Sequence, residues 1–331
     1  MDLVYNQALL AKMARVAPHT IARATVQLGI PVIDPNSSIK RYGIDDVVNI
    51  TSHVFSRHEK PITKKTQVFY NFKGGTGKTS LCYQTATHLA ILGFKVLALD
   101  LDPQGHLSMA MQIREDWAGP TIYDVLIGGE NLEDCTINIF PNLDLLPANI
   151  AMTRIEVPLF QKAKREEKLN LALEKAKKEY DFIIIDTNPT ISVLNLSALV
   201  ASDRINIICE TQPFSLSGLR VLMKETTELF QEMRMSPDYC IIPNKYEIKT
   251  ATAQEVLGAL RAEYGSYVMG SVVRKSEDIN ISAKKKLPVS AFCKARSTAF
   301  EDVMDLVHEI IVCSQGKHGV DKMKIAAAGG M

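Results

Sequence analysis

The stretch that decides the fold runs from Phe72 to Ser80 and reads FKGGTGKTS. It lies between residues 67–71, which have the composition of a strand, and residues 79–93, which have the composition of a helix. Glycines at such a junction let the backbone curl so that its N–H groups point at phosphate oxygens, and the first turn of the helix adds positive potential. The sequence therefore predicts a loop that cradles the phosphates of a nucleoside triphosphate.

Two side chains of this loop indicate its ligands. The lysine before the threonine, Lys78, suits the β- and γ-phosphates, and the hydroxyl of Thr79 suits Mg²⁺. We therefore expect ATP, ADP and Mg²⁺ as cofactors. The residues expected to bind nucleotide are those of the loop and one asparagine further along the chain: Lys73, Gly74, Gly75, Thr76, Gly77, Lys78, Thr79, Ser80 and Asn244.

The chain around this loop alternates short apolar runs with amphipathic ones. This alternation predicts an α/β domain over residues 66–313, with a mainly parallel sheet covered by helices on both faces, in three layers. The expected strands are 67–71, 95–100, 143–146, 182–186, 204–209, 239–243 and a run around 267–273, and the expected helices are 79–93, 169–179, 217–233, 252–264 and 298–313.

A smaller unit precedes this domain. Residues 8–14, 21–28 and 45–55 have helical composition, and residues 30–41, with two prolines, suggest a hairpin or wing. Helix, turn, helix and wing is the order of a winged helix-turn-helix, which we expect over residues 1–60. A linker is expected at 61–65 and a flexible tail at 314–331. The residues expected to contact DNA are His19, Thr20 and Arg23 on the second helix and Lys40 and Arg41 on the wing. The alternative is a helical dimerisation module that does not touch DNA.

Composition limits the class of protein. The chain has 331 residues, 46% of them hydrophobic and 23% charged, with a formal net charge of +1. Its apolar runs are much shorter than the roughly 18–20 residues that span a bilayer, and its six cysteines show no Cys-x-x-Cys spacing. We expect a cytoplasmic protein with reduced thiols and no membrane partner.

Positive charge gathers in two regions. Residues 1–65 carry nine Lys or Arg against five Asp or Glu, and residues 274–296 carry seven against two, so the remainder is acidic. Basic regions on an acidic body indicate a polyanionic partner. Beside a nucleotide-binding loop, they favour nucleic acid.

Three motifs together resemble those of one family. The loop has a second lysine, Lys73, as in the K-G-G-x-G-K-[ST] pattern of the deviant Walker A ATPases, and in particular the ParA/Soj partition ATPases. Residues 98–105, ALDLDPQG, look like the D-x-D-P-Q-G segment of that family, and residues 182–189, FIIIDTNP, look like its Walker B strand and switch. The resemblance covers residues 66–313. Asn188 departs from the family, whose members commonly have proline there.

The resemblance assigns roles to individual residues. It implies that Lys73 crosses the interface of an ATP-bound dimer to the partner's nucleotide, and that Asp102 positions the attacking water; with Lys78 these form the expected catalytic set. Asp186 ends an apolar strand, so its carboxylate should reach Mg²⁺ through a water. Asp100 is expected to support the metal site or the geometry of the loop.

The resemblance also implies partners. Family members bind DNA without sequence preference in the ATP state, associate with the nucleoid, and are stimulated in slow ATP hydrolysis by DNA and a ParB-like centromere-binding protein. Lys249 matches a position where relatives carry an arginine that contacts DNA. The basic cluster of Arg274, Lys275, Lys284, Lys285 and Lys286 lies where relatives have another DNA-contacting segment, so the resemblance implies the charge of this region. Relatives with an N-terminal DNA-binding domain also repress their own operator. Partition of a plasmid or chromosome is the expected function; the alternatives are a transcriptional regulator tuned by ATP and a positioning system for a protein cargo.

Overall fold

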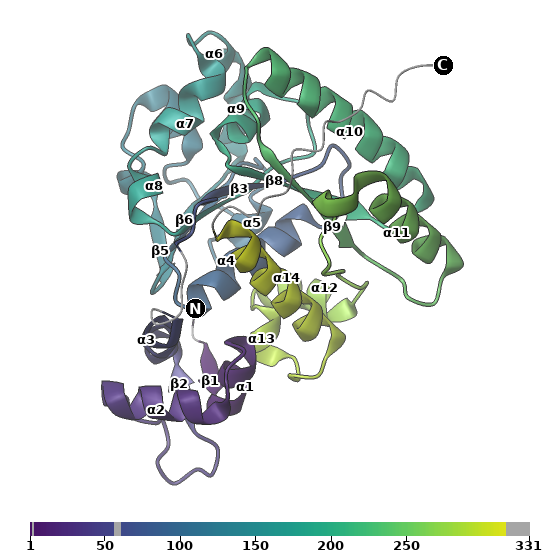
Figure 1. Cartoon of the computed structure of the whole chain (residues 1–331). Helices are drawn as coiled ribbons and strands as arrows, with labels where there is room; N and C mark the ends of the chain where they lie inside the picture. The colour runs from purple at the N-terminus through teal and green to yellow at the C-terminus, as the bar shows by residue number, and fades with distance from the viewer. Residues whose placement is uncertain (2, 56–60, 316–331) are drawn as a thin grey trace.

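A seven-stranded sheet forms the centre of the described chain, which comprises residues 1, 3–55 and 61–315 of this computed structural model (Figure 1). Every neighbouring pair is parallel except the first, which is antiparallel. The expected α/β fold with a mainly parallel sheet is therefore confirmed. In spatial order the strands are β5 (Ile137–Phe140), β6 (Leu143–Leu146), β4 (Val96–Asp100), β7 (Phe182–Asp186), β3 (Thr66–Tyr70), β8 (Arg204–Glu210) and β9 (Asp238–Asn244).

Helices cover both faces of the sheet because successive side chains of a strand point in opposite directions. In β7, Phe182 and Ile184 belong to one apolar cluster, whereas Ile183 and Ile185 belong to a second cluster on the other face. The first cluster includes α4 (Lys78–Ile91), α5 (His106–Ala110), α13 (Val289–Phe292) and α14 (Thr298–Ser314), with α12 (Glu277–Lys285) at its edge; the second includes α6 (Glu156–Phe160), α7 (Lys168–Ala172), α8 (Ala176–Glu179), α9 (Val193–Ala201), α10 (Pro213–Glu232) and α11 (Ala251–Tyr264).

Two expectations about elements are wrong, and one strand was not expected. The run around 267–273 is not a strand of the sheet. It follows the 3₁₀ turn η5 (Gly265–Tyr267) and meets β9 through an isolated bridge between Ile241 and Val268 and a backbone hydrogen bond from Val273 to Pro243. The helix expected over 169–179 is divided into α7 and α8. The sequence did not predict β5, an antiparallel edge strand. The remaining short turns are η1 (Asp124–Gly128), η2 (Glu133–Cys135), η3 (Ile150–Arg154) and η4 (Arg165–Glu167).

The N-terminal unit, residues 1–55, contains β1 (Val4–Asn6), α1 (Gln7–Met13), α2 (Pro18–Leu28), β2 (Arg41–Gly43) and α3 (Ile44–Phe55). Helix α2 begins at Pro18, earlier than expected, and ends at Gly29 in the left-handed conformation. Residues 30–40 do not form a hairpin of their own. Instead β2 pairs antiparallel with β1. The winged helix-turn-helix remains a prediction.

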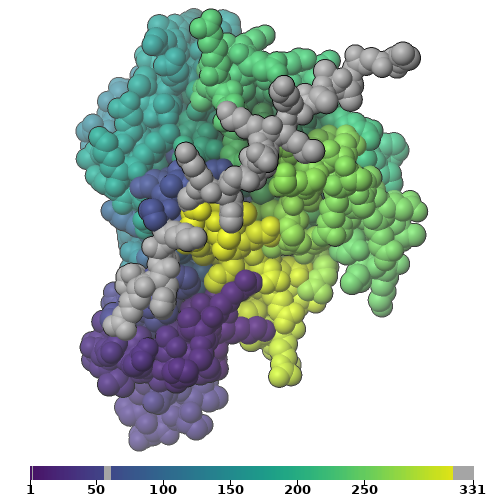
Figure 2. Space-filling view, viewed as in Figure 1, coloured from purple at the N-terminus to yellow at the C-terminus, as the bar shows by residue number. Residues whose placement is uncertain are grey.

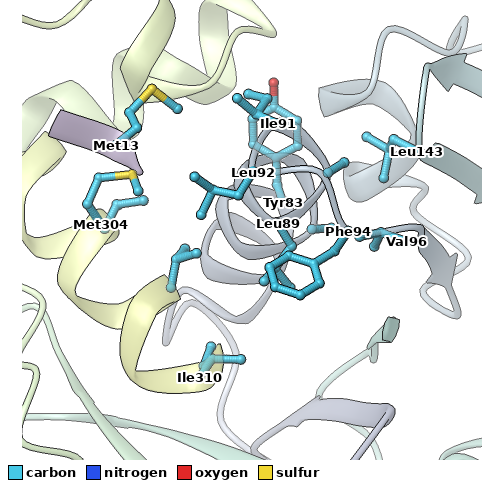
Figure 3. Packing of buried hydrophobic residues seen from close by; sticks show 14 of the residues in the cluster. Met13, Tyr83, Leu89, Ile91, Leu92, Phe94, Val96, Leu143, Met304 and Ile310 are labelled. Atoms are coloured by element: carbon cyan, nitrogen blue, oxygen red, sulfur yellow. The ribbon is translucent and has the colours of Figure 1, made fainter. Parts of the chain in front are cut away.

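The N-terminal unit shares a core with the α/β domain. Figure 2 shows its purple residues packed against the yellow residues near the end of the chain, and Figure 3 shows Met13 and Met304 on one side of α4, with Val96 and Leu143 on the other. Polar contacts also join these surfaces. For example, the Thr51 hydroxyl donates to the carbonyl of Ile91 at 2.7 Å, and His308 Nε2 bonds to the carbonyl of Met13 at 2.7 Å. The boundary between the two units is therefore a packed interface.

We expect Gly93→Ala to weaken this interface. Gly93 has a φ of +100°, and a Cβ there would lie 2.6 Å from the backbone of Ser52 in α3. Left-handed strain and the clash together should lower the free energy of unfolding by about 2–4 kcal/mol, measured by denaturant titration. Gly258→Ala is the control: Gly258 lies in α11 with open space around it, so alanine should raise stability by about 0.5–1 kcal/mol. Equal stability of Gly93→Ala and wild type would contradict the close packing.

The expected linker and the start of the expected tail contact each other. Helix α14 extends to Ser314, and Gln315 bridges to Ile62 within the expected linker. The rest of the expected tail, residues 316–331, and residues 56–60 lie outside the described residues. Within the part of the chain that the structure describes, no helix combines the length and apolar character needed to cross a membrane.

Candidate nucleotide-binding site

A cavity of about 1010 Å³ opens at the carboxyl edge of the sheet. The loops after β3, β4, β7 and β9 line it, because the carboxyl ends of parallel strands meet at one edge. Residues of α12 also line it. The expected loop residues from Gly74 to Ser80 and Asp102 all face this cavity. Its other lining residues include Tyr83, Gln84, Gln104, His106, Met109, Asn188, Thr190, Lys245, Asn280, Lys284 and Lys286.

The loop depends on two glycines in the left-handed region, Gly75 at φ +74° and Gly77 at φ +95°. A Cβ on Gly77 would lie 2.4 Å from Nδ2 of Asn244. That nitrogen donates to the carbonyl of Thr76 at 2.7 Å. Asn244, which was expected to bind nucleotide, thus stabilises the conformation of the loop through this hydrogen bond.

Lys78 lies inside the loop. Its side chain is buried, and its ammonium donates to the carbonyl of Lys73 at 3.1 Å. Burial lowers the pKa of Lys78, while the charges of Asp186 and Asp102 act in the opposite direction. A partly desolvated ammonium of this kind gains electrostatic energy when an anionic ligand enters.

Asp186 is a buried carboxylate that its neighbours compensate only in part. Both of its oxygens are buried and make no hydrogen bond of normal geometry with the described residues, and the nearby Thr79 hydroxyl and Lys78 charge only partly offset the burial. Burial, followed by the charge of Asp100, raises the pKa of Asp186 well above its ordinary value. An orphaned carboxylate beside the Thr79 hydroxyl matches the oxygen ligands that Mg²⁺ prefers, with water in the remaining positions.

Both carboxylate oxygens of Asp100 already accept hydrogen bonds from the protein. Its Oδ1 accepts from the backbone of Asp102 at 3.1 Å, and its Oδ2 accepts from the backbone and hydroxyl of Ser108 at 2.8 and 2.7 Å. Burial raises the pKa of Asp100 to about 6. These contacts favour the supporting role over direct metal binding, since Asp100 fixes the turn that presents Asp102 to the cavity.

The expected DNA-binding residues do not form one patch. His19, Arg23, Lys40 and Arg41 are exposed and Thr20 is half-buried on the N-terminal unit, while Lys249 is exposed before α11. Arg274 is held by Asp302 through its backbone and guanidinium, at 2.5–3.0 Å. Lys275 pairs with Glu247 at 2.9 Å, and Lys285 lies over the ring of Phe292. Lys284 and Lys286 line the nucleotide cavity.

Sequence reasoning missed two residues beside the loop. Glu210 is the last residue of β8, and Lys245 directly follows β9. Their carboxylate and ammonium contact each other at 2.8 Å, and Glu210 also contacts Lys73 at 2.6 Å. A signal was present: an acidic residue that ends an apolar strand at this edge is the same pattern that singled out Asp186.

Comparisons with known proteins agree with this geometry. The sequence matches the AAA domain family over residues 64–239. It is 29% identical to the cell division protein PomZ of Myxococcus xanthus, over 93% of this chain and 92% of that protein. It is 30% identical to the chromosome-partitioning ATPase Soj of Treponema pallidum, over 75% of this chain and 97% of that protein.

A solved structure supports the ligands. Cobyrinic acid a,c-diamide synthase from Mycobacterium smegmatis, with an ATP analogue and magnesium bound, has a TM-score of 0.61 and 25% identity, covering 67% of this chain and 92% of that protein. The same enzyme is also known with ADP and magnesium. The expectation that ATP or ADP and Mg²⁺ are the cofactors is confirmed.

Proposed function

We propose that this chain, which belongs to the AAA-domain family of ParA/Soj-type P-loop ATPases, is a nucleotide-driven switch in which ATP joins two copies and hydrolysis separates them. The observation that carries the proposal is Lys73. Its side chain is 52% exposed and contacts Glu210 at the rim of the loop. Since Lys78 already occupies the loop, a second, exposed lysine at the rim is available to a nucleotide on another copy.

The chemistry assigns one task to each residue. Lys78 and the loop backbone hold the phosphates, and Thr79 and Asp186 hold the metal, Asp186 through a water. Bound Mg²⁺ neutralises charge on the phosphates. Asp102 faces the cavity and orients the attacking water, while Asp100 fixes Asp102 through their 3.1 Å contact.

DNA is the proposed polyanionic partner. Exposed cations lie on the N-terminal unit and before α11, and phosphate contacts from such residues give affinity without sequence information. We propose nonspecific nucleoid binding through Lys249, Lys275 and Lys285. Lys284 and Lys286 share the nucleotide cavity, which would link DNA contact to nucleotide state. Operator recognition by the N-terminal unit, through His19, Thr20, Arg23, Lys40 and Arg41, is a second proposed mode.

The cargo has two candidates. Partition of a plasmid or chromosome, with a ParB-like protein and DNA stimulating hydrolysis, is favoured by the likeness to Soj. Positioning of a protein assembly is favoured by a specific observation: the match to PomZ, a cell division protein, covers 93% of this chain, whereas the match to Soj covers 75%. A regulator tuned by ATP would instead show operator binding as its main activity.

Light scattering tests the switch. With a non-hydrolysable ATP analogue and Mg²⁺ the wild-type chain should double its mass, and Lys73→Ala should stay a monomer. Nonspecific duplex DNA should bind only the doubled form, and the affinity should fall roughly 10³-fold or more between 50 and 200 mM salt if six or more phosphates are contacted. A wild-type chain that stays monomeric with the analogue bound would overturn the proposal.

A further inference from the structure

One buried carboxylate holds two lysines beside the nucleotide loop. Glu210 is 5% exposed at the carboxyl end of β8. Its Oε2 accepts from Lys73 Nζ at 2.6 Å, and its Oε1 accepts from Lys245 Nζ at 2.8 Å. Lys245 also donates to the carbonyl of Gly75 in the loop. Each oxygen of Glu210 therefore has its own lysine partner.

The two lysines stabilise a charge that burial opposes. Burial alone would raise the pKa of Glu210, but the hydrogen bonds and charges of Lys245 and Lys73 outweigh it and hold the pKa below its ordinary value. A buried carboxylate that loses all its partners is strongly destabilising. Glu210 can therefore lose one lysine only because it keeps the other.

The two lysines differ in their other contacts and in their exposure. Lys73 contacts the carboxylate alone through its side chain and is 52% exposed, whereas Lys245 is also tied to the loop and is 39% exposed. Lys73 is thus the partner that can leave, and Lys245 the partner that stays.

We propose that Glu210 is a positioning residue that holds Lys73 on its own subunit, and that Lys245 keeps Glu210 paired when Lys73 moves to the partner's nucleotide. This inference rests on the proposed ATP-dependent dimer. In the resting subunit Glu210 competes with the partner's nucleotide for Lys73. Dimer formation must therefore break this contact, and the contact raises the protein concentration at which the dimer forms.

Two substitutions should shift that concentration in opposite directions. Glu210→Gln keeps the shape but removes the charge, so Lys73 is released and the dimer should form at roughly tenfold lower protein concentration with the ATP analogue. Lys245→Met removes the partner that stays, so departure of Lys73 would strand the carboxylate, and the dimer should need severalfold more protein. Sedimentation equilibrium at a series of concentrations measures both.

Asp302→Asn is the matched control. Asp302 is another buried carboxylate paired with a basic residue, Arg274, at 2.5 Å, and a general loss of ion-pair stability would affect it equally. Its dimerisation should equal that of wild type. If Glu210→Gln dimerises like wild type, or if Lys245→Met shifts the concentration in the same direction as Glu210→Gln, the inference is overturned.

The resting contact has its own readout. In the nucleotide-free chain, acetylation of Lys73 by an N-hydroxysuccinimide ester, followed by mass spectrometry, should be severalfold faster in Glu210→Gln than in wild type, and unchanged in Asp302→Asn. Unchanged labelling in Glu210→Gln would overturn the contact itself. A wild-type chain that never dimerises would overturn the proposed function instead, so the two failures are distinguishable.

Discussion

Replacing Asp186 with asparagine should abolish ATP hydrolysis and at the same time make the nucleotide-free protein more stable at neutral pH. Both effects have one cause. Asp186 has two buried oxygens without hydrogen-bond partners among the described residues, so its charge is unfavourable until a cation arrives. Asparagine removes the charge and, with it, the group that recruits Mg²⁺. Hydrolysis should fall at least about 100-fold.

The raised pKa of Asp186 determines the direction in which the stability of the nucleotide-free chain changes with pH. The folded-state pKa of Asp186 is raised by burial and by Asp100, so the folded chain binds this proton more tightly than the unfolded chain. Stability from this group is therefore present at low pH and is lost as pH rises above the unfolded value of 3.8 towards the folded value. Asp186→Asn should flatten this part of the pH profile, measured by urea unfolding from pH 4 to 8 without nucleotide.

Asp302→Asn should do the opposite. Asp302 is equally buried but compensated by Arg274, so its loss should destabilise the chain by about 1–3 kcal/mol and leave hydrolysis near the wild-type rate. If Asp186→Asn unfolds more easily than wild type at pH 7, the carboxylate has a partner that the geometry does not contain, and its assignment to the metal is wrong.

The predictable parts of this protein are those that local chemistry dictates. The loop from Gly74 to Ser80 needs glycines at φ values near +74° and +95°. Its conformation can therefore be predicted from its own sequence, without knowledge of the segments that pack against it. Asp186 ends an apolar strand, and the fold of parallel strands carries it to the same edge. Short patterns therefore predicted most of the sheet and the cavity-facing loop, and the family resemblance added Asp102.

The unpredictable parts depend on contacts between distant segments. Lys73 and Glu210 lie 137 residues apart in sequence, and no local pattern predicts that their side chains form an ion pair. Arg274 counted as a free cation in the sequence, yet Asp302, 28 residues further along, binds it. The strand expected near 267–273 has the right composition, but an isolated bridge from Ile241 to Val268 and one backbone hydrogen bond from Val273 to Pro243 do not make it a strand beside β9. Charge and propensity identify candidate residues, and packing decides which remain available.

The N-terminal unit illustrates the same limit. A linker at 61–65 suggested a separable domain, because polar residues interrupt the apolar pattern there. In the structure, Met13 and Val47 of that unit and Val303 of α14 belong to one apolar cluster. The unit therefore packs on α4, the helix that begins at Lys78 in the nucleotide loop.

Replacing Lys78 with alanine should lower nucleotide affinity by roughly 100-fold or more, since a charge-assisted contact to phosphate in a partly buried site accounts for about 3 kcal/mol. The structure explains why the effect is specific. Lys78 is 6% exposed, and its ammonium contacts the loop carbonyl of Lys73 rather than an acidic partner. The other lysines that line the cavity, Lys245, Lys284 and Lys286, come from other segments of the described chain and not from the loop.

Lys177→Ala provides the matched control for this loss. Lys177 is also a partly buried lysine whose pKa burial lowers, and it contacts Asn170 at 2.7 Å and the carbonyl of Ala201 at 2.9 Å, away from the cavity. Its removal should reduce stability but leave the dissociation constant for a fluorescent ATP analogue unchanged within twofold. Similar affinities for Lys78→Ala and wild type would mean that the phosphates bind elsewhere, because a cradle whose buried cation contributes nothing has no electrostatic reason to hold a triphosphate.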